Sequence, residues 1–213
     1  MATNMAMKNS HPLITDFHVD ILREVVNIGM GQAGALLATL LHQFVKLSIP
    51  EVSIIEAKDI NFAISRIVGD HQQVDAVRQA FFKQWHGEAI VIYPQNETNN
   101  IANLMGHSAD SQDLSHTELL LDLSNIQVGA CLNGIAKQLN IVLNYAAPAI
   151  FAEQTYVEKL FNIDDLSWRQ CLMMEVNFAV EDDGFKSHLF IFLTEDSVPS
   201  LIKNLERFMD QYQ

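Results

Sequence analysis

The chain has 213 residues, of which 49% are hydrophobic, so it is long and apolar enough to bury a substantial core. It carries 26 acidic and 13 basic residues, and the resulting formal net charge of -13 disfavours nucleic acid and anionic membrane surfaces as partners. The N-terminal residues contain no apolar h-region, and Cys131 and Cys171 lack CxxC spacing. We therefore expect a cytoplasmic protein with reduced thiols and no secretory signal.

The first predicted element is a long helix within residues 20 to 50, "DILREVVNIGMGQAGALLATLLHQFVKLSIP". Thr15 or Asp16 is suited to cap its start, and Pro50 is expected to be the first residue of a strand after a tight exit, because proline cannot continue a helix. Charged and amide side chains interrupt the apolar run, which disfavours a transmembrane helix.

Short apolar runs bounded by turn residues follow this helix and predict strands, a short helix, a turn and a closing helix. The predicted strands are 52–57, 77–85, 88–94, 149–157, 171–180 and 187–194, with a short helix at 96–106, a polar joint at 107–116, a turn at 181–184 and a closing helix at 195–212. The connections are too short for crossovers, so antiparallel pairing is expected.

The chain contains an internal repeat. A shift of 98 residues places Asn27 on Asn125 and Pro50 on Pro148, with 22 residues between Asn and Pro in both copies. Each half therefore predicts the order helix, strand, strand, strand, helix. We expect a single α/β domain over residues 1–213 with pseudo-twofold symmetry, in which repeat one (about 15–106) and repeat two (about 115–212) share a largely antiparallel sheet flanked by long helices.

Polar residues form a strip along each long helix, within about 60° of one another at helical spacing. The strip runs acid, acid, amide, glycine, as Asp20, Glu24, Asn27 and Gly31 in the first copy and Glu118, Asp122, Asn125 and Gly129 in the second. Each glycine costs up to about 1 kcal/mol of helix propensity, so the strip is suited to close approach by another backbone.

Part of this pattern has a structural explanation. Ser115 and Glu118 fit a capping box, and Asp20 is suited to stabilise a helix dipole. Capping does not explain Asn27 and Asn125, because an asparagine inside a helix competes for backbone hydrogen bonds. The duplicated amide therefore favours a functional role.

The first strip resembles the CheC, CheX and FliY phosphatases of bacterial chemotaxis. Their motif is Asp or Ser, three residues, Glu, two residues, Asn, then 22 residues to Pro, and it is matched by Asp20, Glu24, Asn27 and Pro50. The segment "NIGMGQA" is also similar to the Asn-Ile-Gly-x-Gly-x-Ala stretch of this family.

The second copy matches the family less fully. Asn125 and Pro148 are in place, but Asp122 holds the Glu position and Glu118 the leading position. Because Asp is one methylene shorter than Glu, we expect the second site to be the weaker one. Two motif copies without a further module resemble a stand-alone CheC protein.

The resemblance implies hydrolysis of the aspartyl phosphate of a phosphorylated CheY-type response regulator. In the family, Asn orients the attacking water and Glu contacts a lysine of the regulator, which brings its own Mg²⁺, so no cofactor or metal of the chain's own is expected. CheC proteins can also bind the deamidase CheD, which the sequence neither favours nor excludes. The expected catalytic residues are Glu24, Asn27, Asp122 and Asn125, and the expected partner-docking residues are Asp20, Gly31, Glu118 and Gly129.

Two other functions stay open. A catalytically silent adaptor of the same fold could bind a response regulator or a flagellar switch component. A metal or small-molecule binding domain is less favoured, because the His residues are dispersed and His116 is better explained by a solvated or structural role. No Gly-rich phosphate loop, G-x-S-x-G elbow or H-E-x-x-H pair occurs in the sequence.

Overall fold

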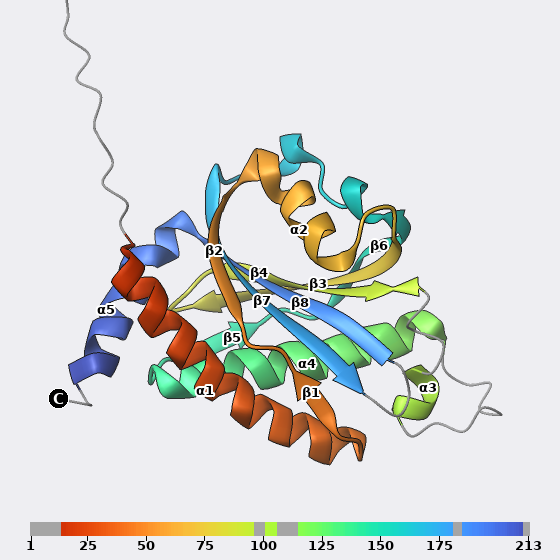
Figure 1. Ribbon diagram of the computed structural model, residues 1–213, viewed down its shortest axis with the longest axis horizontal. Coiled ribbons are helices and arrows are strands. Elements are labelled where there is room, and N and C mark those ends of the chain that lie inside the picture. Colours follow the sequence, from red (N-terminus) through yellow and green to blue (C-terminus); the bar gives the residue numbers. More distant parts are fainter. Residues whose placement is uncertain (1–13, 96–100, 106–114, 181–184, 211–213) are drawn as a thin grey trace, which may run out of the picture.

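The computed structural model describes residues 14–95, 101–105, 115–180 and 185–210 (Figure 1). Its helices are α1 (Asp16–Leu41), α2 (Ile60–Val68), α3 (Ile101–Leu104), α4 (His116–Gln138) and α5 (Val198–Asp210). Its strands are β1 (Val45–Leu47), β2 (Glu51–Glu56), β3 (Gln73–Lys83), β4 (Gly87–Pro94), β5 (Leu143–Tyr145), β6 (Ala149–Tyr156), β7 (Gln170–Val180) and β8 (Phe185–Thr194). Short 3-10 turns lie at Ala57–Asp59, Val157–Lys159, Ile163–Asp165 and Glu195–Ser197.

The strands form a single eight-stranded sheet in which every pair is antiparallel. The path runs β1, β7, β8, β4, β3, β5, with β2 also paired to β7 and β6 to β3. Strands β1 and β2 of the first half therefore pair with a strand of the second half, and β5 and β6 pair with a strand of the first. Because of this exchange the two repeats share one sheet, as expected.

All six predicted strands are present, displaced by a few residues at some ends. The structure adds α2 and the three-residue strands β1 and β5 to the predicted order. The closing helix is confirmed as a 3-10 turn followed by α5. Of the predicted 96–106 helix, Ile101–Leu104 forms α3, and residues 96–100 and 106 lie outside the described residues. The turn at 181–184 and nearly all of the joint at 107–116 lie outside the described residues.

Helices cover both faces of the sheet. Helices α1, α4 and α5 lie on one face and α2 lies on the other (Figure 1). The larger core fills the space between the sheet and α1, α4 and α5, and includes Leu22, Leu37 and Leu123, each 0% exposed. The smaller core lies beneath α2 and includes Ile60 and Ile64. Burial of each such side chain stabilises the fold by roughly 1.5–3 kcal/mol.

Helices α1 and α4 cross at two glycines. A Cβ atom on Gly29 would lie 2.8 Å from the backbone nitrogen of Ile135, and one on Gly134 would lie 2.4 Å from the backbone oxygen of Gly29. Only glycine allows two helix backbones to approach this closely. The contact fixes the two long helices, and therefore the two polar strips, relative to each other.

Both long helices end in the same way. His42 follows α1 with φ 53° and Asn140 lies beyond α4 with φ 50°, both in the left-handed region that stops a helix. The chain then reverses into the short strands β1 and β5 and reaches Pro50 and Pro148 immediately before β2 and β6. The constant Asn-to-Pro spacing is thus the length of helix, reversal and short strand that brings the chain back alongside the helix.

By length and composition alone, α1 and α4 could each cross a membrane, with a mean hydropathy of 1.3 over their most apolar windows. In the structure each helix instead buries one face in the protein core. For α4, 67% of that window is buried, and for α1 39%. Core helices of this kind meet the same criteria, so these two helices are weak evidence for membrane insertion.

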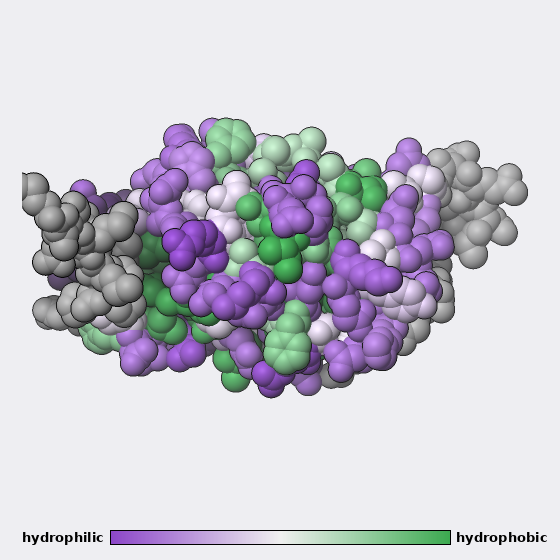
Figure 2. Space-filling view, turned by 90° about the horizontal axis from the view of Figure 1, so that it is seen from above, coloured by the Kyte–Doolittle hydropathy of each residue, from purple (hydrophilic) through white to green (hydrophobic). Residues whose placement is uncertain are grey.

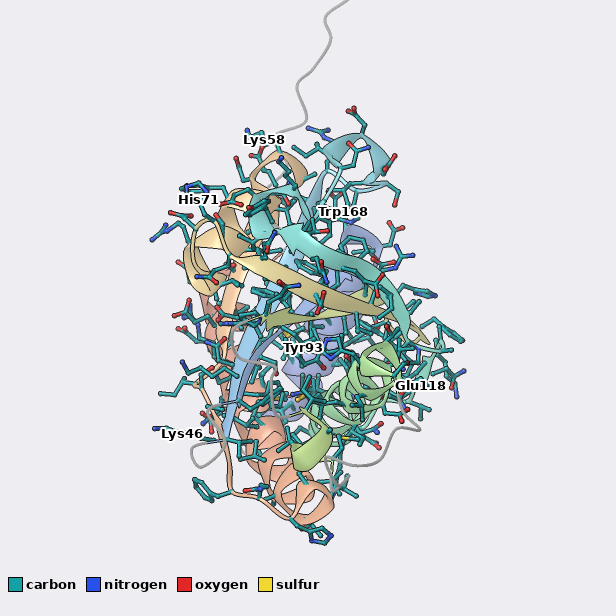
Figure 3. All side chains as sticks on the ribbon, turned by 90° about the vertical axis from the view of Figure 1, so that its right-hand side faces the viewer. Lys46, Lys58, His71, Tyr93, Glu118 and Trp168 are labelled. Atoms are coloured by element: carbon teal, nitrogen blue, oxygen red, sulfur yellow. The ribbon has the colours of Figure 1, made fainter. Side chains whose placement is uncertain are left out.

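A buried hydrogen-bond chain fastens α4 to the sheet. The hydroxyl of Tyr93 lies 2.7 Å from Ser124 Oγ and donates to Gln127 Oε1 at 2.9 Å, and Gln127 Nε2 donates to Ser187 Oγ at 2.9 Å. Figure 3 shows Tyr93 in the interior of the molecule. Burial raises the pKa of the Tyr93 hydroxyl, so it stays protonated.

We expect His188 of β8 to make stability pH-dependent. Its ring faces Asn177 and stacks on Phe190, and burial, with a smaller contribution from Lys186, lowers its pKa to about 4. Between pH 6.5 and 4 the unfolded chain binds the proton more readily, so the folded state loses about 2–3 kcal/mol as the pH falls through this window.

Burial raises the pKa of the nearby Glu175, which makes the folded state more stable at low pH and so opposes the effect of His188. The His188→Gln variant keeps Glu175, so the difference between variant and wild type isolates the contribution of His188. Urea unfolding of both proteins should show the wild type losing stability relative to the variant below pH 6.5. An equal pH dependence of the two proteins would contradict the assignment.

Candidate functional site

The first polar strip lies on the solvent-facing side of α1. Thr15 caps the helix, since its hydroxyl accepts from the backbone nitrogen of His18 at 3.4 Å. The strip begins more than one turn after this cap, and the side chains of Asp20, Glu24 and Asn27 are all exposed. The opposite side of α1 is buried in the core, so amphipathicity alone determines which side the strip occupies.

The three polar residues of this strip differ in their partners. Asp20 pairs with Arg23 on the same helix, Oδ1 to Nη1 at 3.0 Å, and both side chains are more than half exposed. Within the described residues, no hydrogen bond or ion pair involves the side chains of Glu24 or Asn27. A free carboxylate and a free amide therefore stand one turn apart on an exposed helix face.

A groove of about 360 Å³ lies directly beside Asn27. One wall is the small-residue part of α1, and the other is β1 with the residues that flank it. The lining residues are Asn27, Met30, Gly31, Gly34, Ala35, Ala38, Phe44, Val45, Leu47, Ser48 and Ile49. Phe44 is 71% exposed and Ile49 82% exposed, so the groove presents apolar side chains next to a polar amide.

The second strip begins with a carboxylate that is already engaged. Glu118 Oε2 accepts from the backbone nitrogen of Ser115 at 2.7 Å, and Ser115 Oγ accepts from the backbone nitrogen of Glu118 at 3.2 Å, which closes the capping box expected from the sequence. Glu118 Oε2 also accepts from the Ser115 hydroxyl at 3.0 Å. The two hydrogen bonds that Ser115 donates to this carboxylate lower the pKa of Glu118, and the one from the backbone nitrogen has the larger effect. Figure 3 places Glu118 at the edge of the molecule, whereas Asp122 is exposed without a hydrogen bond to any described residue.

Asn125 is exposed but held. Its Oδ1 accepts from Gln79 Nε2 at 3.0 Å, and the same Nε2 donates to the backbone oxygen of Ala146 at 2.9 Å. Gln79 belongs to β3 and is only 3% exposed. The two equivalent asparagines therefore differ in the structure, since no described residue bonds to the Asn27 side chain in this way.

The strip glycines have open space around them. A Cβ atom at Gly31 or Gly129 would meet no described atom within 4 Å. Packing inside the protein therefore does not require glycine at either position, in contrast to Gly29 and Gly134. The absent side chain leaves room for a partner about one helical turn beyond each asparagine.

The described residues offer little for other chemistry. They contain no group of three or more His, Cys, Asp or Glu side chains placed to hold a metal ion. Both cysteines are buried, and burial raises the pKa of Cys171 to about 12, so its thiol is not a nucleophile at neutral pH. His116 lies 3.2 Å from Asp75 Oδ2, an ion-pair or hydrogen-bond contact near the start of α4.

A larger hollow of about 560 Å³ lies on the other face of the sheet, beside residues 160–168. Trp168, Phe161 and Phe192 are among its aromatic lining residues, and no residue of either strip lines it. Figure 2 views the molecule from above, on the α2 side, and shows hydrophobic side chains between hydrophilic ones. The hollow is larger than the groove beside Asn27, but it lies apart from the polar strips.

Sequence reasoning missed the strand and loop neighbours of the strips. Gln79 stands between Val77 and Phe81, which both point into the core, so a polar residue at an inward position was the available sign. The pairing of Gln79 with Asn125 could not be found in this way, because it depends on the distance between β3 and α4. The wall of the groove formed by Phe44 and Ile49 depends likewise on where β1 returns.

No model of a known protein family matches the chain. Solved structures share its fold. FliY from Thermotoga maritima superposes with a TM-score of 0.65 at 17% identity, covering 92% of this chain and 98% of that one. The FliM middle domain from H. pylori gives 0.60 at 8% identity, covering 90% and 99%. The chemotaxis protein CheX from Desulfovibrio desulfuricans gives 0.51 at 12% identity, covering 80% and 99%. These likenesses confirm the CheC-like fold.

Proposed function

We propose that this chain, which has the fold shared by CheX and FliY proteins, hydrolyses the aspartyl phosphate of a CheY-type response regulator. The observation that carries the proposal is the state of α1, where the unbonded amide of Asn27 lies beside an apolar groove and the unbonded carboxylate of Glu24 lies one turn earlier. Both groups are free to contact a partner without breaking a bond inside the protein.

The chemistry requires little beyond positioning. A water oxygen attacks phosphorus in line, the bond between phosphorus and the aspartyl oxygen breaks, and the carboxylate takes the electron pair. Asn27 would hold that water by its amide, and Glu24 would pair with a cationic side chain of the regulator. Mg²⁺ bound by the regulator would neutralise charge on the phosphoryl group, so the chain would need no metal ion of its own. The proposed place of the reaction is the cytoplasm.

The shape around Asn27 suits a protein substrate. The open position at Gly31 lets another backbone approach α1, and the exposed Phe44 and Ile49 give that partner apolar area to bury. The resemblance implies that the asparagine inserts toward the phosphoryl group of a folded regulator, so its side chain would have to extend outward from the surface of this chain. Exposed groups on a rigid helix meet this requirement.

The direct test is phosphate release from a Mg²⁺-bound, phosphorylated CheY-type regulator. We expect the purified chain to accelerate release in proportion to its concentration, and EDTA to abolish both the acceleration and the intrinsic hydrolysis. The matched control is the chain with Asn27→Ala and Asn125→Ala together. If several cognate regulators lose phosphate at their intrinsic rates with the wild type present, the phosphatase proposal is wrong.

A catalytically silent adaptor is the second candidate. The likeness to the FliM middle domain, with a TM-score of 0.60 over nearly the whole length of that structure, favours it. Flagellar switch proteins with this architecture would use it to bind a partner rather than to hydrolyse a phosphate. An adaptor would bind the regulator through the same helix face without changing the rate of phosphate release. Binding measured by calorimetry, together with an unchanged rate, would select this function.

A further inference from the structure

Gln79 occupies a position at which a polar side chain needs a reason. It lies on β3 between Val77 and Phe81, both 1% exposed, and is itself 3% exposed. A buried amide without partners costs roughly 1–3 kcal/mol by protein mutational data, so its contacts matter. Both contacts of Gln79 are made by Nε2, and Oε1 has no partner among the described atoms.

These contacts fix the orientation of two amides. The backbone oxygen of Ala146 can only accept, so the NH₂ group of Gln79 must be the part that faces it. The same NH₂ lies 3.0 Å from the Asn125 amide, which must therefore present its oxygen to Gln79. The NH₂ group of Asn125 is consequently turned away from the sheet. This orientation of both amides follows from hydrogen-bond chemistry alone.

The part of the first repeat that the structure describes has no equivalent of this contact. Val45 and Leu143 are equivalent under the 98-residue shift. Val45 pairs with Val180 of β7 and Leu143 pairs with Lys83 of β3, so Val180 and Lys83 occupy equivalent positions in the sheet. Four residues earlier on each strand lie Gln79 and Val176.

Val176 is fully buried in the core that also contains Val77 and Phe81, which confirms that it faces the same side of the sheet as Gln79. Valine has no side-chain donor. The Asn27 amide is therefore unbonded within the described residues, whereas the Asn125 amide is held through β3.

We propose that Gln79 is a positioning residue that holds Asn125 with its NH₂ group directed at the partner, so that the second site is a preorganised hydrogen-bond donor. The proposal rests on the proposed function for its kinetic consequence, but the restraint itself does not. An amide that is already oriented loses less rotamer freedom when the phosphoryl group arrives. The amide of the first site, Asn27, has no such restraint among the described residues.

Side-chain amide NMR tests the restraint without any activity. Asn27→Asp and Asn125→Asp variants assign the two NH₂ groups in ¹⁵N-labelled protein. In the wild type we expect the Asn125 NH₂ to show restricted picosecond motion and the Asn27 NH₂ to be mobile, and the isosteric Gln79→Met change to release Asn125. Equal mobility of the two amides in the wild type would overturn the proposal.

Single-site kinetics test the consequence. In the Asn27→Ala background, where only the second site operates, Gln79→Met should lower kcat for phosphate release about threefold to tenfold with KM nearly unchanged. In the Asn125→Ala background the same substitution should leave the first-site rate within twofold. Equal losses in both backgrounds would indicate a purely structural role, and a rise in kcat would contradict preorganisation.

The two proposals can fail separately. A wild-type chain with no phosphatase activity but a restrained Asn125 amide would refute the proposed function and keep the positioning role of Gln79. Full activity with a mobile Asn125 amide would do the reverse.

Discussion

Replacing Asn27 and Asn125 together by alanine is expected to lower the accelerated rate of phosphate release by about 100-fold. The loss arises because alanine cannot orient the attacking water, whereas docking through Glu24 is retained. Asn27→Ala alone should remove most of the activity and Asn125→Ala less. The measurement is single-turnover phosphate release with excess chain over phosphorylated regulator, which separates the chemical step from docking.

The ranking of the two sites follows from their neighbouring acids. Glu24 has the full reach of a glutamate and no partner among the described residues, whereas Asp122 is one methylene shorter and Glu118 is engaged with Ser115. Asp122→Glu is the matched control and should raise the activity that remains in Asn27→Ala. Equal losses from the two single alanine variants would show that the acid at position 122 does not limit the second site.

Two glycine substitutions are expected to change stability in opposite directions. Gly134→Ala should lower the free energy of unfolding by about 2–3 kcal/mol, because its Cβ would lie 2.4 Å from the backbone oxygen of Gly29 and neither helix can shift freely. Gly31→Ala should raise it by up to about 1 kcal/mol, because alanine is the better helix former and the added Cβ meets open space. Urea unfolding measures both.

Kinetic measurements test whether Gly31 also has a role in docking. If a regulator approaches α1 at Gly31, the more stable Gly31→Ala protein should show a KM several-fold higher than the wild type. Gly129→Ala provides the same comparison for the second site, since its Cβ also meets open space. An unchanged KM in Gly31→Ala would place the docking surface elsewhere. A Gly134→Ala protein as stable as the wild type would contradict the close helix crossing.

The strand prediction succeeded where the apolar runs were long enough. Runs such as 171–180 and 88–94 alternate or stay apolar over many residues, and β7 and β4 occupy them. The three-residue strands β1 and β5 escaped because so short a segment has no period of its own. Helix α2 escaped because its nine residues lie between predicted strands, although Ile60 and Ile64 have helical spacing and are fully buried.

By itself the sequence determined the two long helices, their polar strips and the equivalence of Asn27 with Asn125. Helical period and internal repetition can both be found from the order of residues, without knowing which elements contact each other. Only the tertiary structure decided what each strip meets. Gln79 reaches Asn125 across 46 residues of sequence because the register of β3 points it toward α4. Side-chain direction and the distance between elements come from packing, and so does the difference between a free and a held amide.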